Sequence, residues 1–372
     1  MEQGAINLSD VKLGVWYKAG ENTPLTSHNL DSDTALYAVA NIVEITSQDE
    51  LASINTDSVT LAGKYILLND INLDESGAGF EDTLGWIPIG NLSDKFTGIF
   101  NGNFHKITNM WTNRTSTYHV GFFGSTDNAQ IKNLGVEIAE GMEIRGFYGI
   151  GGIAGFISHS NITNVYSVGN ISGYSSVGGI VGYVSNSNIA NAYSTGNING
   201  NNSAAGGIVG DAGYINITNA YSTGNVSSYW ATGGIIGYFY IGIVTNVYST
   251  GNISGYNYIG GIAGRIYDNS NVSNVAAING LVSGNSEVNR VAGGHISVAS
   301  NNFALNSMSG SFSNSGDIKY HGTDKTEAEL KIQETYLNDL SWNFGNNADN
   351  PWVWGAFEGY AYPTLYWQTQ KP

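Results

Sequence analysis

The stretch GGIAGFISHSNITNVYSVGNISGYSSVG, residues 151–178, is the first copy of a unit that fills residues 151–284. Each copy contains the tetrapeptide G-x-x-G, which begins at positions 152, 179, 207, 234 and 261, so successive copies lie 27 or 28 residues apart. A period of this size is typical of repeat architectures, in which one small unit packs mainly against its neighbours.

A second motif, N-x-Y-S-[TV]-G-N-[IV], follows the tetrapeptide in four of the copies. It begins at Asn164, Asn191, Asn219 and Asn246, and a fifth copy from Asn274 has Ala276 in place of the tyrosine. The apolar runs are short and β-branched, with Gly, Asn and Ser between them, and no window has helical spacing. Three short strands and three turns in about 27 residues describe one coil of a parallel β-solenoid.

The predicted fold is therefore all-β, a single right-handed parallel β-helix of roughly nine coils with N- and C-terminal caps. A β-propeller is the competing repeat fold, but its blades need about 40 residues or more. In a solenoid with a step of about 4.8 Å, equivalent residues stack in columns. Two predicted asparagine columns are Asn164, Asn191, Asn219, Asn246 and Asn274, and Asn170, Asn197, Asn225 and Asn252.

These residues resemble the GLUG repeats of bacterial surface and secreted proteins, because both the G-x-x-G and the Y-S-[TV]-G-N line recur in register. The resemblance covers about 134 residues, counted from 151 to 284. It implies a cell-surface, adhesin-like β-helix and supplies no catalytic residues. Residues 47–150 resemble the segment that commonly precedes such repeats, with WIPIG and FTGIFNGNF after a short helix.

Five regions are predicted from these patterns. Residues 1–46 form strands at the entrance of the solenoid or a small separate β module, and residues 47–150 form the first coils. Ser47 and Glu50 fit a capping box before a helix at Gln48–Ile54. Residues 151–284 are the repeat coils, 285–316 a degenerate last coil, and 317–372 an aromatic-rich C-terminal cap with a short helix at Thr326–Leu337.

The cap is predicted because bare strand edges and an open apolar interior recruit other chains. Its aromatic side chains include Trp342, Trp352, Trp354 and Trp367. A sugar-binding aromatic shelf is the alternative interpretation of these four tryptophans.

Composition restricts the partners. A net charge of −16 and a pI near 4.5 argue against nucleic acid, which needs clustered Lys and Arg, and against peripheral binding to anionic lipid. No apolar run is long enough to span a bilayer. Zero cysteines exclude disulfides and thiolate metal sites. We expect a secreted or cell-surface bacterial chain whose signal and anchor lie outside this sequence.

The repeats offer little for catalysis. Their only acidic residues are Asp211 and Asp268, two coils and about 10 Å apart even on one face. Arg265 and Asp268 are expected to form a surface ion pair. The acids between Asp70 and Asp94 could bind calcium, but they lack the spacing of a calcium loop, and no spacing supports a hydrolytic site of His105 with two carboxylates. We therefore predict no catalytic residues, metal or cofactor.

The sharpest binding candidate is a column of tyrosines with a threonine row two residues further on. Alternation along a strand puts each tyrosine and its threonine on one face. The column is either an exposed strip that contacts protein or glycan, or part of the core. Ile162, Ile189 and Ile217 lie an even number of residues before the tyrosines and so should share their face of the strand, which favours the core unless the asparagine column is a corner. The candidate residues are Tyr166, Tyr193, Tyr221, Tyr248, Thr195, Thr223 and Thr250.

The predicted function is an extracellular, adhesin-like bacterial surface module. It would bind a host or matrix protein or a glycan along a repeat face, or act as a rigid spacer. The alternative is a β-helix enzyme that degrades polysaccharide, either as a hydrolase or as a lyase. Such an enzyme would need two or three carboxylates within about 10 Å of each other.

Overall fold

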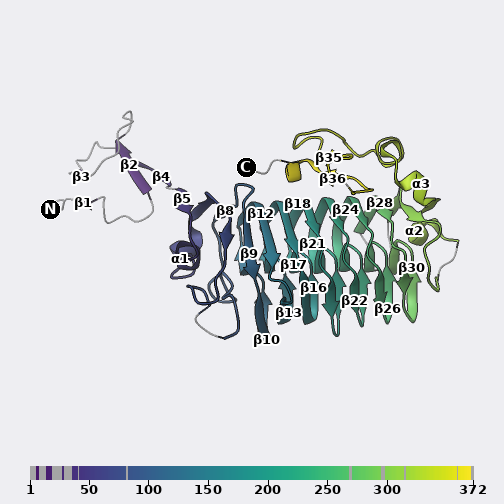
Figure 1. Cartoon of the computed structure of the whole chain (residues 1–372), viewed down its shortest axis with the longest axis horizontal. Coiled ribbons are helices and arrows are strands. Elements are labelled where there is room, and N and C mark those ends of the chain that lie inside the picture. The colour runs from purple at the N-terminus through teal and green to yellow at the C-terminus, as the bar shows by residue number, and fades with distance from the viewer. Residues whose placement is uncertain are drawn as a thin grey trace.

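The protein is an all-β parallel solenoid whose coils stack along one long axis (Figure 1). The computed structural model describes residues 6–7, 14–18, 27–28, 36–40 and 42–369, apart from 81–82, 268–269, 295–297, 314–315 and 358. At the N-terminus, β1 (Ile6–Asn7) pairs antiparallel with β3 (Ser27–His28), and β2 (Gly14–Lys18) with β4 (Leu36–Ala40).

One coil contains four strands, β17 (Val181–Ser185), β18 (Ser187–Ser194), β19 (Ile198–Gly200) and β20 (Ala204–Gly206). Each pairs in parallel with its counterpart one coil away, and the repeats stay in register, as in Tyr166↔Tyr193 and Ala192↔Ala220. The column that contains β17 has seven strands: β11 (Phe123–Asp127), β14 (Ala154–Ser158), β17, β21 (Val209–Ser222), β24 (Ile236–Ser249), β27 (Ala263–Ile266) and β31 (Ala292–Gly294).

The solenoid thus has about seven turns rather than the predicted nine. The difference arises at both ends. The entrance, residues 42–110, is built from short strands separated by long turns: β5 (Ile42–Ile45), β6 (Lys64–Leu67), β7 (Ile71–Asn72), β8 (Ile99–Asn101) and β9 (Lys106–Met110). After β33 (Phe303–Leu305), β34 (Thr323–Lys325) adds one more parallel strand before the chain leaves the coils.

The remaining strands fill the other columns of the same coils. The long columns contain β10 (Thr112–Val120), β12 (Gln130–Ile138), β13 (Glu143–Gly151), β15 (Asn161–Val168), β16 (Asn170–Gly178) and β28 (Ser270–Ala277). Shorter members are β22 (Val226–Ser228), β23 (Ala231–Gly233), β25 (Ile253–Gly255), β26 (Asn257–Gly260), β29 (Val282–Ser283), β30 (Ser286–Asn289) and β32 (Val298–Ser300).

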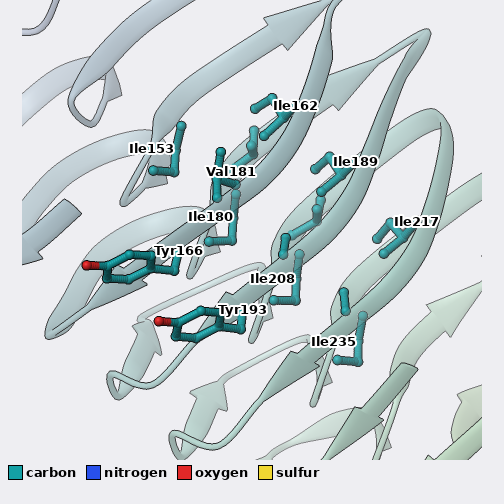
Figure 2. Packing of buried hydrophobic residues seen from close by; sticks show 14 of the residues in the cluster. Ile153, Ile162, Tyr166, Ile180, Val181, Ile189, Tyr193, Ile208, Ile217 and Ile235 are labelled. Carbon is teal, nitrogen blue, oxygen red and sulfur yellow. The ribbon is translucent and has the colours of Figure 1, made fainter. Parts of the chain in front are cut away.

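The first apolar residue of each G-x-x-G points into the coil. These residues stack as one fully buried column of Ile153, Ile180, Ile208, Ile235 and Ile262, and Figure 2 shows four of them beside a second column of Ile162, Ile189 and Ile217. The glycines are needed because coils approach closely here. A Cβ on Gly179 would lie 2.1 Å from the carbonyl oxygen of Gly207 in the next coil.

The first asparagine column is a corner of the coil. Asn164, Asn191, Asn219 and Asn246 all have left-handed backbones with φ of 54–55°, which asparagine tolerates better than most residues. Their side-chain amides donate from coil to coil, as in Asn191 Nδ2 to Asn164 Oδ1 at 3.0 Å. In the second column the backbone N–H of each asparagine donates to the side-chain oxygen of the previous one. The predicted ladders are confirmed.

Helices are few. The predicted N-terminal helix is α1 (Gln48–Ser53), and Ser47 and Glu50 form the expected capping box. The predicted C-terminal helix is two short pieces. These are α3 (Glu327–Leu330), capped by Thr326, and a π-helical turn at Thr335–Asp339. One further turn of helix, α2 (Ile318–His321), precedes β34.

The tryptophan-rich C-terminus is not a plug over the last coil. Residues 342–369, here called the C-terminal segment, turn back and run along the side of the solenoid (Figure 1). The segment contains the antiparallel pair β35 (Trp352–Val353) and β36 (Thr364–Leu365). Trp342, Trp352 and Trp367 are buried against the tyrosine column. The expected position of the cap is therefore wrong for its tryptophans, because their rings pack on the tyrosine column, whereas α2 and β34 lie against the last strands of the solenoid.

Candidate functional site

The tyrosine column is buried beneath the C-terminal segment. Tyr166, Tyr193, Tyr221 and Tyr248 stack with ring centroids 4.9–5.0 Å apart and planes within 3°, and none is more than 9% exposed. The ring of Trp367 lies 5.6 Å from that of Tyr193. The Tyr248 hydroxyl donates to the Pro363 carbonyl at 2.8 Å, and the Tyr221 hydroxyl bonds the Gln368 side chain.

The exposed strip that the sequence left open is therefore not observed, and the core alternative is only half correct. The corner at Asn164 directs Val165 and Ser167 into the coil, where both are fully buried, and turns Tyr166 outward. Burial under a distant part of the chain raises the pKa of all four tyrosines. At the margin of the column, Thr223 is exposed and Thr195 and Thr250 are partly exposed. A binding role for these threonines remains a prediction.

A group of charges closes the N-terminal end of this column. Glu137 accepts from the Tyr166 hydroxyl and from Lys106 Nζ, both at 3.0 Å. Asp70 accepts from the backbone N–H of Lys106 and contacts His105 Nδ1 at 3.1 Å. His105 thus contacts one carboxylate, Asp70, whereas Glu137 bonds Tyr166 and Lys106. Both oxygens of Glu137 already have partners, so the group stabilises the end of the column.

A serine, a histidine and a carboxylate also meet on the surface. His159 Nδ1 lies 2.9 Å from Ser158 Oγ and 3.2 Å from Asp127 Oδ1. A catalytic triad needs the hydroxyl on one imidazole nitrogen and the carboxylate on the other, so that the ring can relay a proton. Here both oxygens contact the same nitrogen, and the arrangement does not form such a relay.

A different column of side chains remains open to solvent, and we call it the corner row. It consists of the residue that directly follows each G-x-x-G: Phe156, Tyr183, Asp211, Tyr238 and Arg265. The five are paired in register on β14, β17, β21, β24 and β27, and each is partly exposed. Their strand neighbours Val184, Ala212 and Phe239 are fully buried, which shows that the corner row points out of the coil.

Three strands that lie beside the corner row, β16, β20 and β23, carry small residues next to it. Ser176, Ala204 and Ala231 are buried at the positions opposite the row, and a Cβ on Gly210 would lie 2.5 Å from the backbone of Ser176. Nearer the N-terminus this position is His119, whose ring stacks on Phe156 at 4.8 Å and whose Nδ1 bonds Ser125 Oγ at 2.8 Å. Burial and the nearby Lys95 lower the pKa of His119 to about 4, so the ring is neutral at pH 7.

Asp211 lies in the middle of the corner row. Its carboxylate is 3.5 Å from the Ser176 hydroxyl, and burial raises its pKa to about 7. Arg265 lies two coils away from Asp211, and Tyr238 lies on the coil between them. Each coil advances by about 4.8 Å. The Arg265 guanidinium lies over the rings of Tyr258 and Tyr267 at 4.7 and 4.8 Å.

A second set of exposed aromatic rings lies near the middle of β16, at Tyr174, and at the equivalent positions of other coils. Phe147 and Tyr174 stack at 5.0 Å, and Tyr229 and Tyr256 at 4.9 Å with planes within 2°. Tyr229 is 51% exposed. We call these four the turn rings. Neither the turn rings nor the corner row is among the predicted binding residues, although the corner row occupies a constant position, directly after each G-x-x-G.

Metal and membrane signals are limited. Among the described residues, no group of three or more His, Asp or Glu side chains is placed to hold a metal ion. Glu81 and Asp82, part of the acidic stretch considered for calcium, and Asp268, the expected partner of Arg265, lie outside the described residues. No helix of the described chain is long and apolar enough to cross a bilayer.

Comparison with known sequences identifies the repeat. The GLUG motif matches residues 173–199. Over 134 residues the chain is 30% identical to halomucin of Haloquadratum walsbyi. This match covers 35% of this chain and 1% of halomucin. Over 51 residues it is 41% identical to a candidate Gly-rich membrane protein of Evansella cellulosilytica, and the match covers 13% of this chain and 6% of that protein.

Solved structures share the fold. A candidate immunoglobulin A1 protease from Bacteroides ovatus matches with a TM-score of 0.56 and 20% identity, over 88% of this chain and 92% of that one. An IgA1 protease matches with a TM-score of 0.51 and 19% identity, over 78% of this chain and 24% of that one. Identity at this level supports the β-helix alone. The predicted parallel β-solenoid is confirmed, and the predicted GLUG motif is confirmed at residues 173–199.

Proposed function

We propose that this chain is an adhesin-like module of a bacterial surface protein that binds a partner along an open lateral face. The observation that supports this best is the turn rings. Stacked tyrosines that remain about half exposed offer a large contact area at low side-chain entropy cost, and such residues are enriched at interfaces. Surface placement is supported by the similarity to halomucin and to a Gly-rich membrane protein.

The rigid-spacer alternative differs in one observable, because a spacer needs no partner. The test is binding of the purified chain to a glycan array and to immobilised fibronectin, laminin and collagen. Tyr229→Ser combined with Tyr256→Ser removes two turn rings from the surface and should leave the circular dichroism spectrum unchanged. Binding that this variant loses would support the adhesive face, and no binding by the parent chain would favour the spacer.

Cleavage of immunoglobulin A1 enters only through the names of the structural relatives. The serine, histidine and carboxylate that meet at Asp127, Ser158 and His159 lack the two-sided imidazole contact of a triad. Incubation of the chain with human immunoglobulin A1, followed by gel electrophoresis, separates the two ideas. Intact immunoglobulin alongside binding by the chain would support a binding module, and defined fragments would overturn this part of the proposal.

A further inference from the structure

We propose that the corner row is a binding platform for a neutral glycan. One pyranose ring would stack on Tyr238, Asp211 and Arg265 would bond its hydroxyl groups, and the saccharide would continue along the solenoid axis over Tyr183. This inference rests on the proposed adhesin-like function and adds a substrate class and a second site, separate from the turn rings.

The register of the sheet places the required groups side by side. Asp211, Tyr238 and Arg265 are consecutive Cα partners in parallel strands, so they lie about 4.8 Å apart and face the same way. Tyr183 is the partner of Asp211 on its other side. An aromatic ring therefore has a carboxylate on one side and a guanidinium on the other, with a second ring beyond the carboxylate.

The platform is held in place before any ligand binds. Arg265 is fixed by the rings of Tyr258, Tyr267 and Trp230, which surround its guanidinium. In the part of the chain that the structure describes, the Asp211 carboxylate has one weak contact, with the Ser176 hydroxyl at 3.5 Å. Ordered side chains with unused hydrogen-bonding capacity reduce the cost of binding.

The chemistry fits a saccharide better than other ligands. A pyranose has an apolar C–H face, which suits a tyrosine ring, and an edge of hydroxyls, which can donate to a carboxylate and accept from a guanidinium. Sites of this kind combine aromatic surface with a few placed polar groups. A net charge of −16 and the acid in the row disfavour an anionic glycan. The row also repeats once per coil, as an extended glycan repeats once per sugar.

The test is isothermal titration of the full chain with three neutral probes, cellohexaose, xylohexaose and N-acetylated chitohexaose. Tyr238→Ala and Asp211→Ala should each weaken binding by about tenfold or more, whereas Tyr238→Phe, which keeps the ring, should stay within about threefold. The matched control is Tyr214→Ala, because Tyr214 is 47% exposed on the same strand as Asp211 but outside the row. If Tyr238→Ala does not fold, Tyr183→Ala replaces it.

The outcomes separate this proposal from the proposed function. Loss of binding in the row variants, with Tyr214→Ala unchanged, supports the platform. Hexasaccharide binding that the row variants retain and the turn-ring double variant loses overturns the platform but keeps the adhesive function. Binding to matrix protein without binding to any of the three probes has the same meaning. A parent chain that binds neither overturns both.

Discussion

Replacing Trp367 with alanine should release the end of the C-terminal segment and leave the solenoid folded. The Trp367 ring is 4% exposed and lies 6.1 Å from the ring of Tyr166 and 5.6 Å from that of Tyr193. Truncating a buried aromatic side chain to alanine costs about 3–5 kcal/mol. Because Trp367 packs on the outside of the coils, this cost falls on docking of the segment. The population of the undocked state should rise roughly a hundredfold to several-thousandfold.

Hydrogen exchange followed by mass spectrometry measures this effect. The backbone N–H groups of Leu365 and Tyr366 bond Gln368 Oε1 and the Pro351 carbonyl, so both should lose protection. Peptides from β14, β17 and β21 should keep theirs. The control is Tyr360→Ala, since Tyr360 is 48% exposed in the same segment and its truncation should cost less than about 0.5 kcal/mol. Equal loss of protection in the segment and the coils would refute the reasoning, as would no change in either.

Three further predictions concern single side chains. Gly182→Ala places a Cβ 2.1 Å from the backbone nitrogen of Ile150 and should lower the free energy of unfolding, measured by chemical denaturation, by about 1–3 kcal/mol. In the control Gly213→Ala the new Cβ meets nothing nearer than 3.8 Å, so the change should stay within about 1 kcal/mol. Equal losses in the two variants would contradict the close-approach argument. Tyr221→Phe removes the hydroxyl that bonds Gln368 and should cost about 1 kcal/mol, with faster exchange confined to the C-terminal segment. Burial raises the pKa of Asp211 from 3.8 to about 7, so the folded state retains a proton that the unfolded state loses, and the free energy of unfolding should fall as pH rises through this window. Denaturation of Asp211→Asn at several pH values should lack that part of the slope, and an unchanged slope would exclude Asp211 as its source.

The repeat made most of the fold predictable. A period of 27 or 28 residues, short β-branched runs and columns of Gly and Asn are local features that translate directly into coils, close approaches and left-handed corners. The capping box at Ser47 and Glu50 is local too, and it gave the helix start correctly. The number of coils was overestimated because residues 47–110, predicted as full coils, contain only short strands separated by long turns.

The site was predictable only in part. The tyrosine column was found from the sequence, but whether it faces solvent depended on a segment more than 100 residues away, as in the bond between Tyr248 and Pro363. The corner row was missed because its members differ in chemistry. A column that changes from Phe156 to Asp211 to Arg265 has no signature of residue type, so it is recognised only by its constant position after each G-x-x-G, which the strand register bears out.

The sequence alone determined the solenoid, its register and its asparagine ladders, because each of these follows from interactions between one repeat and the next. Only the tertiary structure decided which lateral face is open. The Tyr166–Tyr248 column faces outward from the coils yet is covered, and the row from Phe156 to Arg265 is left uncovered. The physical reason is that docking of the C-terminal segment depends on the match between its tryptophans and one apolar face, and no repeat encodes that contact.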